Sequence, residues 1–207
     1  MNNQWLANAT FLVLGIVCFV LATRAFYVYV LSKSNFLFVI GLSMADIGIS
    51  VIVGYLQDIH LISWNAHLSW YLGTILGASF LVLGSWVSSQ EQIATVKRWL
   101  IILTALYFVQ TLLTPIMPQF PNQYIPAALN ITRTTIGLVG SAHYLMLYLS
   151  KRTRFTLLMS IAFLLIGSGF GVLTPYLFNT TLALFLTFGY SLRIVGYSIL
   201  LTAYSIS

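Results

Sequence analysis

Seven long apolar stretches follow one another along this chain, and they constrain its fold more than any other feature. They cover residues 5–31, 35–57, 68–89, 98–117, 123–149, 154–177 and 181–204. A helix needs about 20 apolar residues to cross roughly 30 Å of hydrocarbon, whereas a barrel strand needs only about ten residues of alternating polarity. Backbone groups within hydrocarbon must be satisfied inside the protein. We therefore expect an all-α integral membrane protein with seven transmembrane helices, forming a single domain over residues 1–207.

The composition supports this fold class. Hydrophobic residues make up 59% of the chain and charged residues only 6%, against about 25% charged residues in a soluble domain. One cysteine cannot form an internal disulfide, so a disulfide scaffold is excluded. The nine basic residues are scattered and form no basic stripe, so we expect a lipid bilayer and no nucleic acid as partner.

Basic residues occur in alternate loops, which predicts the orientation of the chain. The loops after the first, third and fifth stretches, with their edges, contain Lys33, then Lys97 and Arg98, then Lys151, Arg152 and Arg154. The other three loops contain no lysine or arginine. Since loops rich in lysine and arginine stay in the cytoplasm, we expect an outer N-terminus and a cytoplasmic C-terminus. The protein would be a multi-pass protein of a cytoplasmic or plasma membrane.

A weak internal repeat runs through the chain. The segment Leu31-Ser32-Lys33 recurs as Leu149-Ser150-Lys151. Further matches pair Phe36 with Phe155, Ile47-Gly48 with Ile166-Gly167, Val53 with Val172, Gly73 with Gly189 and Leu76 with Leu192. These matches suggest two parallel helix triplets, residues 1–90 and 123–207, linked by the helix at 98–117. The alternative is that apolar helices of limited composition match by chance.

A parallel three-plus-one-plus-three layout resembles the topology of the SWEET sugar transporters. That resemblance implies transport of a small solute. SWEET proteins carry prolines in the bundled helices of both triplets, whereas the first three stretches here have none, and Pro175 lies in the sixth. Microbial rhodopsins, for which related pseudo-repeats are proposed, need a lysine in the seventh helix; this chain has only Arg193 there.

Three charged residues lie near the middle of predicted spans and mark the candidate site. They are Asp46, Arg133 and Arg193, and Asn130 and Tyr197 share helical faces with the two arginines. A charge that faces lipid at this depth costs at least about 2.5 kcal/mol, so all three should face the bundle interior. We expect Asp46 within salt-bridge reach of at least one arginine.

Three interpretations of this charge cluster stay open. The first is a structural ion pair that joins the helices. The second is a site for a small anionic or polar ligand, because two arginines outnumber one aspartate and guanidinium groups bind oxyanions well. In the third, one arginine faces a neighbouring protein chain.

Catalytic and metal sites are not expected. Asp58, His60 and His67 gather around the loop after the second stretch, but their spacing matches no zinc signature. His143 has no second histidine at its depth to complete a haem site, so we interpret it as a packing residue. Three acidic residues at three depths leave little for acid–base catalysis. No cofactor can be assigned.

These observations favour a non-catalytic integral subunit or ligand-binding module of a larger membrane assembly, with other membrane subunits as partners. One alternative is a small-solute transporter with SWEET-like topology. The other is a seven-helix sensor that signals through a partner chain.

Overall fold

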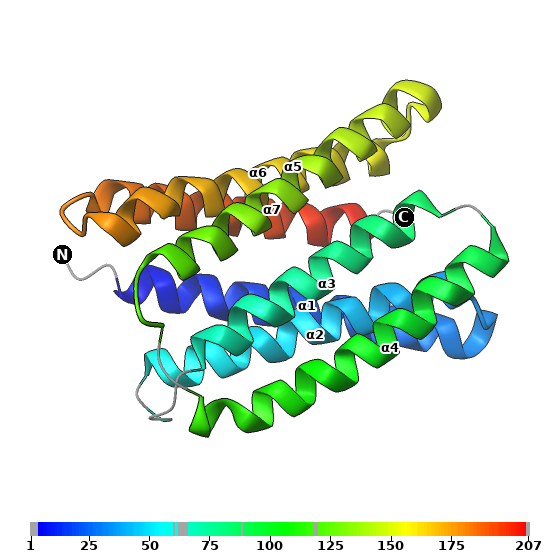
Figure 1. Cartoon of the computed structure of the whole chain (residues 1–207). Helices are drawn as coiled ribbons and strands as arrows, with labels where there is room; N and C mark the ends of the chain where they lie inside the picture. The colour runs from blue at the N-terminus through cyan, green and yellow to red at the C-terminus, as the bar shows by residue number, and fades with distance from the viewer. Residues whose placement is uncertain (1–3, 60, 62–65, 88, 118–119, 206–207) are drawn as a thin grey trace. The chain divides into compact units, whose positions relative to one another are not determined.

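The computed structural model describes residues 4–59, 61, 66–87, 89–117 and 120–205, and their regular secondary structure is entirely helical (Figure 1). The elements are α1 Gln4–Ser32, α2 Asn35–Asp58, α3 His67–Trp86, α4 Gln90–Leu113, the short 3-10 helix η1 Thr114–Ile116, α5 Tyr124–Lys151, α6 Arg154–Phe178 and α7 Ala183–Ser205. Each helix overlaps one of the apolar stretches, so the prediction of an all-α chain is confirmed.

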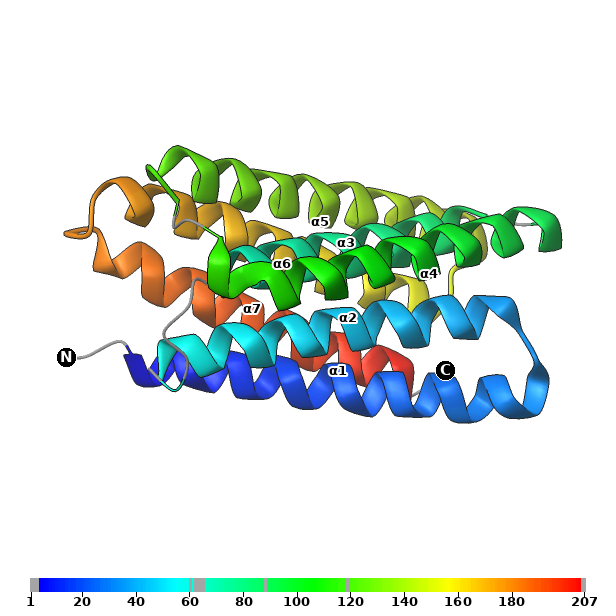
Figure 2. The same ribbon diagram turned by 60° about the horizontal axis from the view of Figure 1, so that its bottom comes forward.

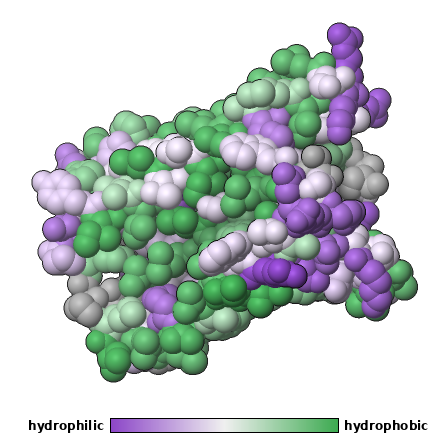
Figure 3. Space-filling view, turned by 45° about the vertical axis from the view of Figure 1, so that its right-hand side comes forward, coloured by the Kyte–Doolittle hydropathy of each residue, from purple (hydrophilic) through white to green (hydrophobic). Residues whose placement is uncertain are grey.

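Six of the helical segments are long and apolar enough to cross a membrane. They are Asn8–Ser32, Asn35–Asp58, His67–Trp86, Gln90–Ile116, Arg154–Phe178 and Ala183–Ser205. On the face drawn in Figure 3, hydrophobic side chains cover the helix shafts and hydrophilic ones gather near helix ends. This is the pattern of a multi-pass membrane protein. Helix α5 has 28 residues but is not among the six, so a seventh span stays a prediction.

Helix α4 begins eight residues before the predicted start at residue 98, at Gln90. Ser89 caps it, because its side-chain oxygen accepts a hydrogen bond from the backbone N–H of Gln92 at 3.2 Å. Glu91 lies in the first turn, where a negative charge is favoured by the helix dipole. A search for apolar stretches misses these turns because they are polar, yet capping and charge make them helical.

The chain divides into two compact units, which are described separately. One unit is Cys18–Gln119 and is called the α2–α4 unit here; it also contains the second part of α1. The other is Met1–Val17 with Phe120–Ser207 and is called the α5–α7 unit.

Small residues bring α2 and α3 close together in the α2–α4 unit. A Cβ atom added at Gly73 would lie 2.5 Å from Ser50 Cβ, and one at Gly77 would meet the carbonyl oxygen of Ser43. Contacts this close require glycine, as is common where membrane helices pack. Helix α4 completes the unit through an apolar cluster formed by Val39, Phe80, Ile93 and Leu100.

Lys97 ties α4 to the turn between α1 and α2, and the part of α1 from Cys18 onward runs beside α2 in Figure 2. Its Nζ donates to Asn35 Oδ1 at 2.9 Å and to Tyr29 Oη at 3.4 Å. The same ammonium lies 4.5 Å from the centre of the Phe38 ring, a cation–π distance. Lys97 therefore lies inside α4 and contacts α1 and α2, whereas the sequence had placed it in the loop before this helix.

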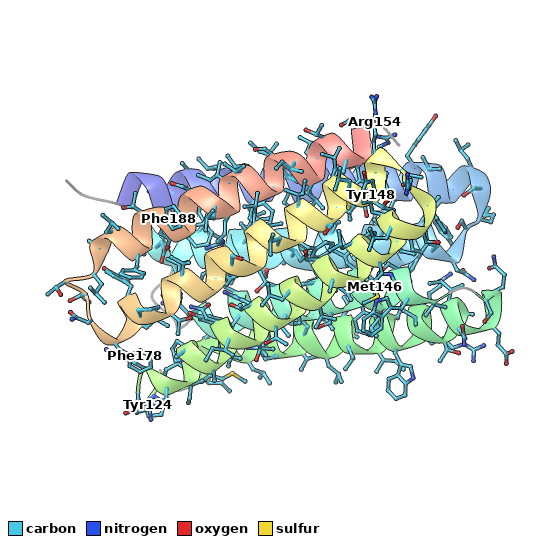
Figure 4. The ribbon with its side chains drawn as sticks, turned by 90° about the horizontal axis from the view of Figure 1, so that it is seen from above. Tyr124, Met146, Tyr148, Arg154, Phe178 and Phe188 are labelled. Carbon is cyan, nitrogen blue, oxygen red and sulfur yellow. The ribbon has the colours of Figure 1, made fainter. Side chains whose placement is uncertain are left out.

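In the α5–α7 unit, α6 packs against α5 on one side and α7 on the other. Gly167 faces α5, where a Cβ atom added at Gly137 would lie 2.5 Å from the Gly167 Cα. Gly169 faces α7, and a Cβ added there would lie 2.8 Å from the carbonyl oxygen of Gly189. Figure 4 shows Tyr124 and Phe178 at one end of this unit; their ring centres are 5.7 Å apart.

The loop between the first two helices has the same backbone conformation in both predicted triplets. Lys33 and Arg152 are the described non-glycine residues with positive φ, at 57° and 49°. Each ends its helix by donating its backbone N–H at 2.7 Å to the carbonyl oxygen of a tyrosine four residues earlier, Tyr29 and Tyr148. The left-handed residue reverses the chain within two residues, so that α2 and α6 can each pack against the preceding helix.

Candidate functional site

Arg193 lies in the middle of the α5–α7 unit and is fully buried, with 0% of its surface exposed. Its side-chain stem passes over Gly169 of α6, where an added Cβ atom would lie only 2.6 Å from Arg193 Cγ. Gly169 therefore leaves the space that the arginine stem needs. Helix α7 alone could not hold this side chain inside the unit, because the close approach of α6 is required.

Arg133 of α5 reaches the same region from the other side of α6. Its guanidinium carbon lies 4.8 Å from the centre of the Phe170 ring, and that of Arg193 lies 4.3 Å from the same centre. Arg193 is also 5.4 Å from the Tyr190 ring. Cation–π contacts stabilise a desolvated guanidinium by about 2 kcal/mol. Phe170 thus holds two buried cations near one another, and all three side chains come from different helices.

The two polar residues predicted beside the arginines are buried in the same unit. Asn130 Oδ1 accepts a hydrogen bond from Arg133 Nη1 at 3.5 Å, and this contact fixes the amide one helical turn before the arginine. Tyr197 is buried one turn after Arg193 on the same face of α7. The structure therefore brings Asn130, Arg133 and Phe170 together with Arg193.

The α5–α7 unit, which contains both arginines, has no aspartate or glutamate. The chain has only three acidic residues, Asp46, Asp58 and Glu91, and all three belong to the α2–α4 unit. Two buried guanidinium groups without an acidic residue in their unit make a strongly positive region at low dielectric, which attracts anions.

Asp46 is fully buried in the α2–α4 unit, where it contacts α4. Its Oδ2 accepts a hydrogen bond from Thr104 Oγ1 at 2.7 Å. Ser43 and Ser50, which lie one turn before and one turn after it on α2, are also fully buried. Because Asp46 and the two arginines belong to different units, an ion pair between them stays a prediction.

Sequence reasoning missed Phe170, Thr104 and a hydroxyl cluster between α3 and α4. In that cluster Ser69 Oγ lies 2.6 Å from Thr111 Oγ1 and donates to Tyr107 Oη at 3.3 Å. The sequence holds a signal for α4, because residues 104, 107 and 111 are polar and recur at helical spacing. It holds none for Phe170, since a phenylalanine in an apolar helix looks like any packing residue.

Two of the residues around the loop after α2 lie close together. Asp58 Oδ1 and His67 Nε2 are 4.0 Å apart, while His60 lies outside the described residues. Within the described part of the chain, no three His, Cys, Asp or Glu side chains come together as a metal site would require. His143 packs edge-on against Tyr144, with ring centres 5.6 Å apart.

Comparisons with protein-family models, with curated proteins and with solved structures find no match for this chain. The function must therefore be argued from the residues themselves.

Proposed function

We propose that this chain is a non-catalytic, seven-helix integral membrane module that binds an anionic ligand between α5, α6 and α7. The observation that carries the proposal is the pair of buried guanidinium groups, 4.8 and 4.3 Å from the centre of one phenylalanine ring. A buried charge at membrane depth is retained where it has a use, because its desolvation is costly. An oxyanion beside these two groups would offset part or all of their positive charge and accept hydrogen bonds from their N–H groups.

A thermal-stability measurement on the purified protein in mild detergent tests this proposal. Sodium phosphate, sulfate and acetate are compared with sodium chloride at constant ionic strength. A ligand at a hundred times its dissociation constant stabilises the folded state by about 2.7 kcal/mol, so one of these anions should raise the melting temperature in a saturable manner. Phosphate and sulfate are tetrahedral, whereas acetate is planar. The anion that raises the melting temperature most therefore shows whether the ligand resembles a phosphate or a carboxylate.

Substitutions link the effect to the site. Arg193→Gln and Phe170→Leu should abolish the anion-dependent rise, the first by removing a cation and the second by removing the ring that holds both. Arg154→Gln is the matched control, because Arg154 is exposed at the start of α6. If no anion stabilises the protein, or if Arg193→Gln responds as the wild type does, the proposal is wrong.

The module would act within a larger membrane assembly, because it has no motif for catalysis of its own. Copurification in mild detergent tests this part. Membrane chains that stay bound at a fixed stoichiometry would support it, and a protein that is pure and monodisperse without partners would contradict it.

A specific observation favours a second candidate, a small-solute transporter with a parallel repeat. The spacing from Lys33 to Arg152 is the same as the spacing from Tyr29 to Tyr148 and from Phe36 to Phe155. In this register the equivalent of Lys33 is Arg152 rather than Lys151. Two residues with the rare left-handed conformation thus occupy equivalent positions in the two triplets.

Helix contacts support the same register. A Cβ atom added at Gly48 would lie 3.3 Å from Cys18 Cβ of α1. A Cβ atom added at Gly167 would lie 3.0 Å from Gly137 Cα of α5. The spacing from Gly48 to Gly167 equals that from Cys18 to Gly137.

A second set of contacts lies between the next two helices of each triplet. Gly77 approaches the Ser43 carbonyl and the Ile47 side chain of α2, and their equivalents in the same register are Gly196, Ala162 and Ile166. This register replaces the earlier pairing of Gly73 with Gly189, because it places Gly73 opposite Leu192. A Cβ atom added at Gly196 would lie 3.2 Å from the Ala162 carbonyl oxygen and 2.7 Å from Ile166 Cγ1. Equivalent contacts at a constant spacing are what a duplicated triplet predicts.

The transporter alternative makes a different experimental claim. Purified protein in liposomes would accelerate uptake of a small solute without any partner chain. Uptake that is lost in Arg193→Gln but kept in Arg154→Gln would support transport over simple binding, and liposomes with no uptake of sugars or small anions would contradict it.

A further inference from the structure

A second polar cluster lies in the α2–α4 unit and does not belong to the arginine site. Asp46 and Ser43 occupy one face of α2, three residues apart, and both have 0% of their surface exposed. Thr104 of α4 is also buried and donates its hydroxyl proton to Asp46 Oδ2 at 2.7 Å. The cluster contains oxygen atoms only, and they come from two helices that pack against each other.

Two oxygen atoms of this cluster lack a hydrogen-bond partner. Among the residues that the structure describes, neither Asp46 Oδ1 nor Ser43 Oγ has one. The neighbouring Ser50 differs, because its hydroxyl donates to the carbonyl oxygen of Ile47 at 2.7 Å. A buried acceptor without a partner is destabilising, and more so when it carries charge. A ligand that these oxygens bind would remove that cost.

No basic side chain of the same unit supplies the missing positive charge. The lysines and arginines of this unit are Arg24, Lys33, Lys97 and Arg98. Within the described part of the unit, Asp46 forms no ion pair with any of them, and Lys97 donates to Asn35 instead. The carboxylate is thus positioned for a mobile cation.

We propose that Asp46, Ser43 and Thr104 bind a small monovalent cation such as Na⁺. Oxygen-only ligand sets suit hard cations. One carboxylate balances one positive charge, whereas a divalent ion would leave an excess charge in a low-dielectric interior. Thr104 Oγ1 keeps lone pairs for the cation while its proton bonds Oδ2. This site differs from the arginine site in unit, in charge and in ligand, so different ions and different variants test the two proposals.

The test measures the melting temperature of the purified full chain in detergent, at fixed pH and ionic strength, while choline chloride is exchanged for sodium chloride. The wild type should show a saturable rise of at least about 2 °C. Asp46→Asn should abolish the rise, and Ser43→Ala and Thr104→Val should shift its midpoint to higher Na⁺ concentrations. Ser50→Ala is the matched control on the same face of α2 and should keep the wild-type response.

Three kinds of outcome would overturn the proposal. The first is a wild type that melts at the same temperature in sodium and choline, or an Asp46→Asn variant that still responds to sodium. The second is a response to pH alone, which would make the ligand a proton. The third is recovery of an unstable Asp46→Asn variant by Arg133→Gln or Arg193→Gln, which would show an ion pair. If Asp46→Asn does not fold, the midpoint shifts in the other two variants decide the matter.

Discussion

Replacing Gly137 by alanine tests the closest helix contact in the α5–α7 unit. The new Cβ atom would lie 2.5 Å from Gly167 Cα and 3.0 Å from its backbone nitrogen. Both atoms belong to the backbone of α6, so no side chain can rotate away. Helices α5 and α6 would have to separate or slide to accommodate one methyl group.

The expected loss of stability follows from a comparison with Gly171→Ala. At Gly171 the added Cβ would lie 3.2 Å from Thr134 Cγ2, the end of a side chain that can shift slightly. Both substitutions gain the same helix propensity, about 1 kcal/mol, so this contribution cancels in the comparison. Overpacking costs about 1–3 kcal/mol. Gly137→Ala should therefore be about 1–3 kcal/mol less stable than Gly171→Ala.

Thermal unfolding in mild detergent, followed by circular dichroism or an environment-sensitive dye, measures this difference. For a chain of this size, each kcal/mol corresponds to about 2–4 °C in melting temperature. Equal melting temperatures for the two variants would refute the reasoning, because they would mean that α5 and α6 do not pack backbone to backbone at Gly137.

Three further predictions concern other parts of the chain. Lys97→Met should lower the free energy of unfolding by about 1–2 kcal/mol, since it removes the hydrogen bonds to Asn35 and Tyr29 and the cation–π contact with Phe38. The same change at the exposed Arg98 should be neutral, and equal effects would contradict the role of Lys97. Gly77→Ala and Gly196→Ala should both lower the melting temperature more than Gly84→Ala, whose Cβ atom would meet side-chain atoms of Val39 at 3.2 Å and of Phe36 at 3.8 Å. A loss at one of the two positions alone would count against equivalent contacts. A C-terminal tag should be labelled only after the cells are permeabilised, because the loop charges predict a cytoplasmic C-terminus; labelling in intact cells would reverse the orientation.

The helices and the burial of the charged residues could be predicted from the sequence because both follow from local properties. A run of about 20 apolar residues determines a membrane helix by itself. The cost of exposing a charge to lipid applies to Asp46, Arg133 and Arg193 whatever their neighbours are, and the structure buries all three. The start of α4 at Gln90 was missed, because its first turns are helical through capping by Ser89 and not through apolar content.

The partners of those charges depended on the tertiary structure. Phe170 contacts two arginines only because α6 lies between α5 and α7, and the sequence of α6 alone carries no sign of this. Asp46 bonds Thr104, a residue far away in the chain that the packing of α2 against α4 brings within 2.7 Å.

The glycines of α6 show most clearly what the sequence determines and what the tertiary structure determines. In the sequence, Gly167 and Gly171 lie four residues apart, a spacing that allows a close helix contact, and the apolar residues around them predict a membrane helix. The sequence determined this much by itself. It did not determine which neighbour each glycine would face. Gly167 approaches α5, while Gly169 approaches α7 and makes room for Arg193. That choice depends on how three helices pack at once, since the face that a residue presents to a neighbour is a property of the whole unit and not of its own helix.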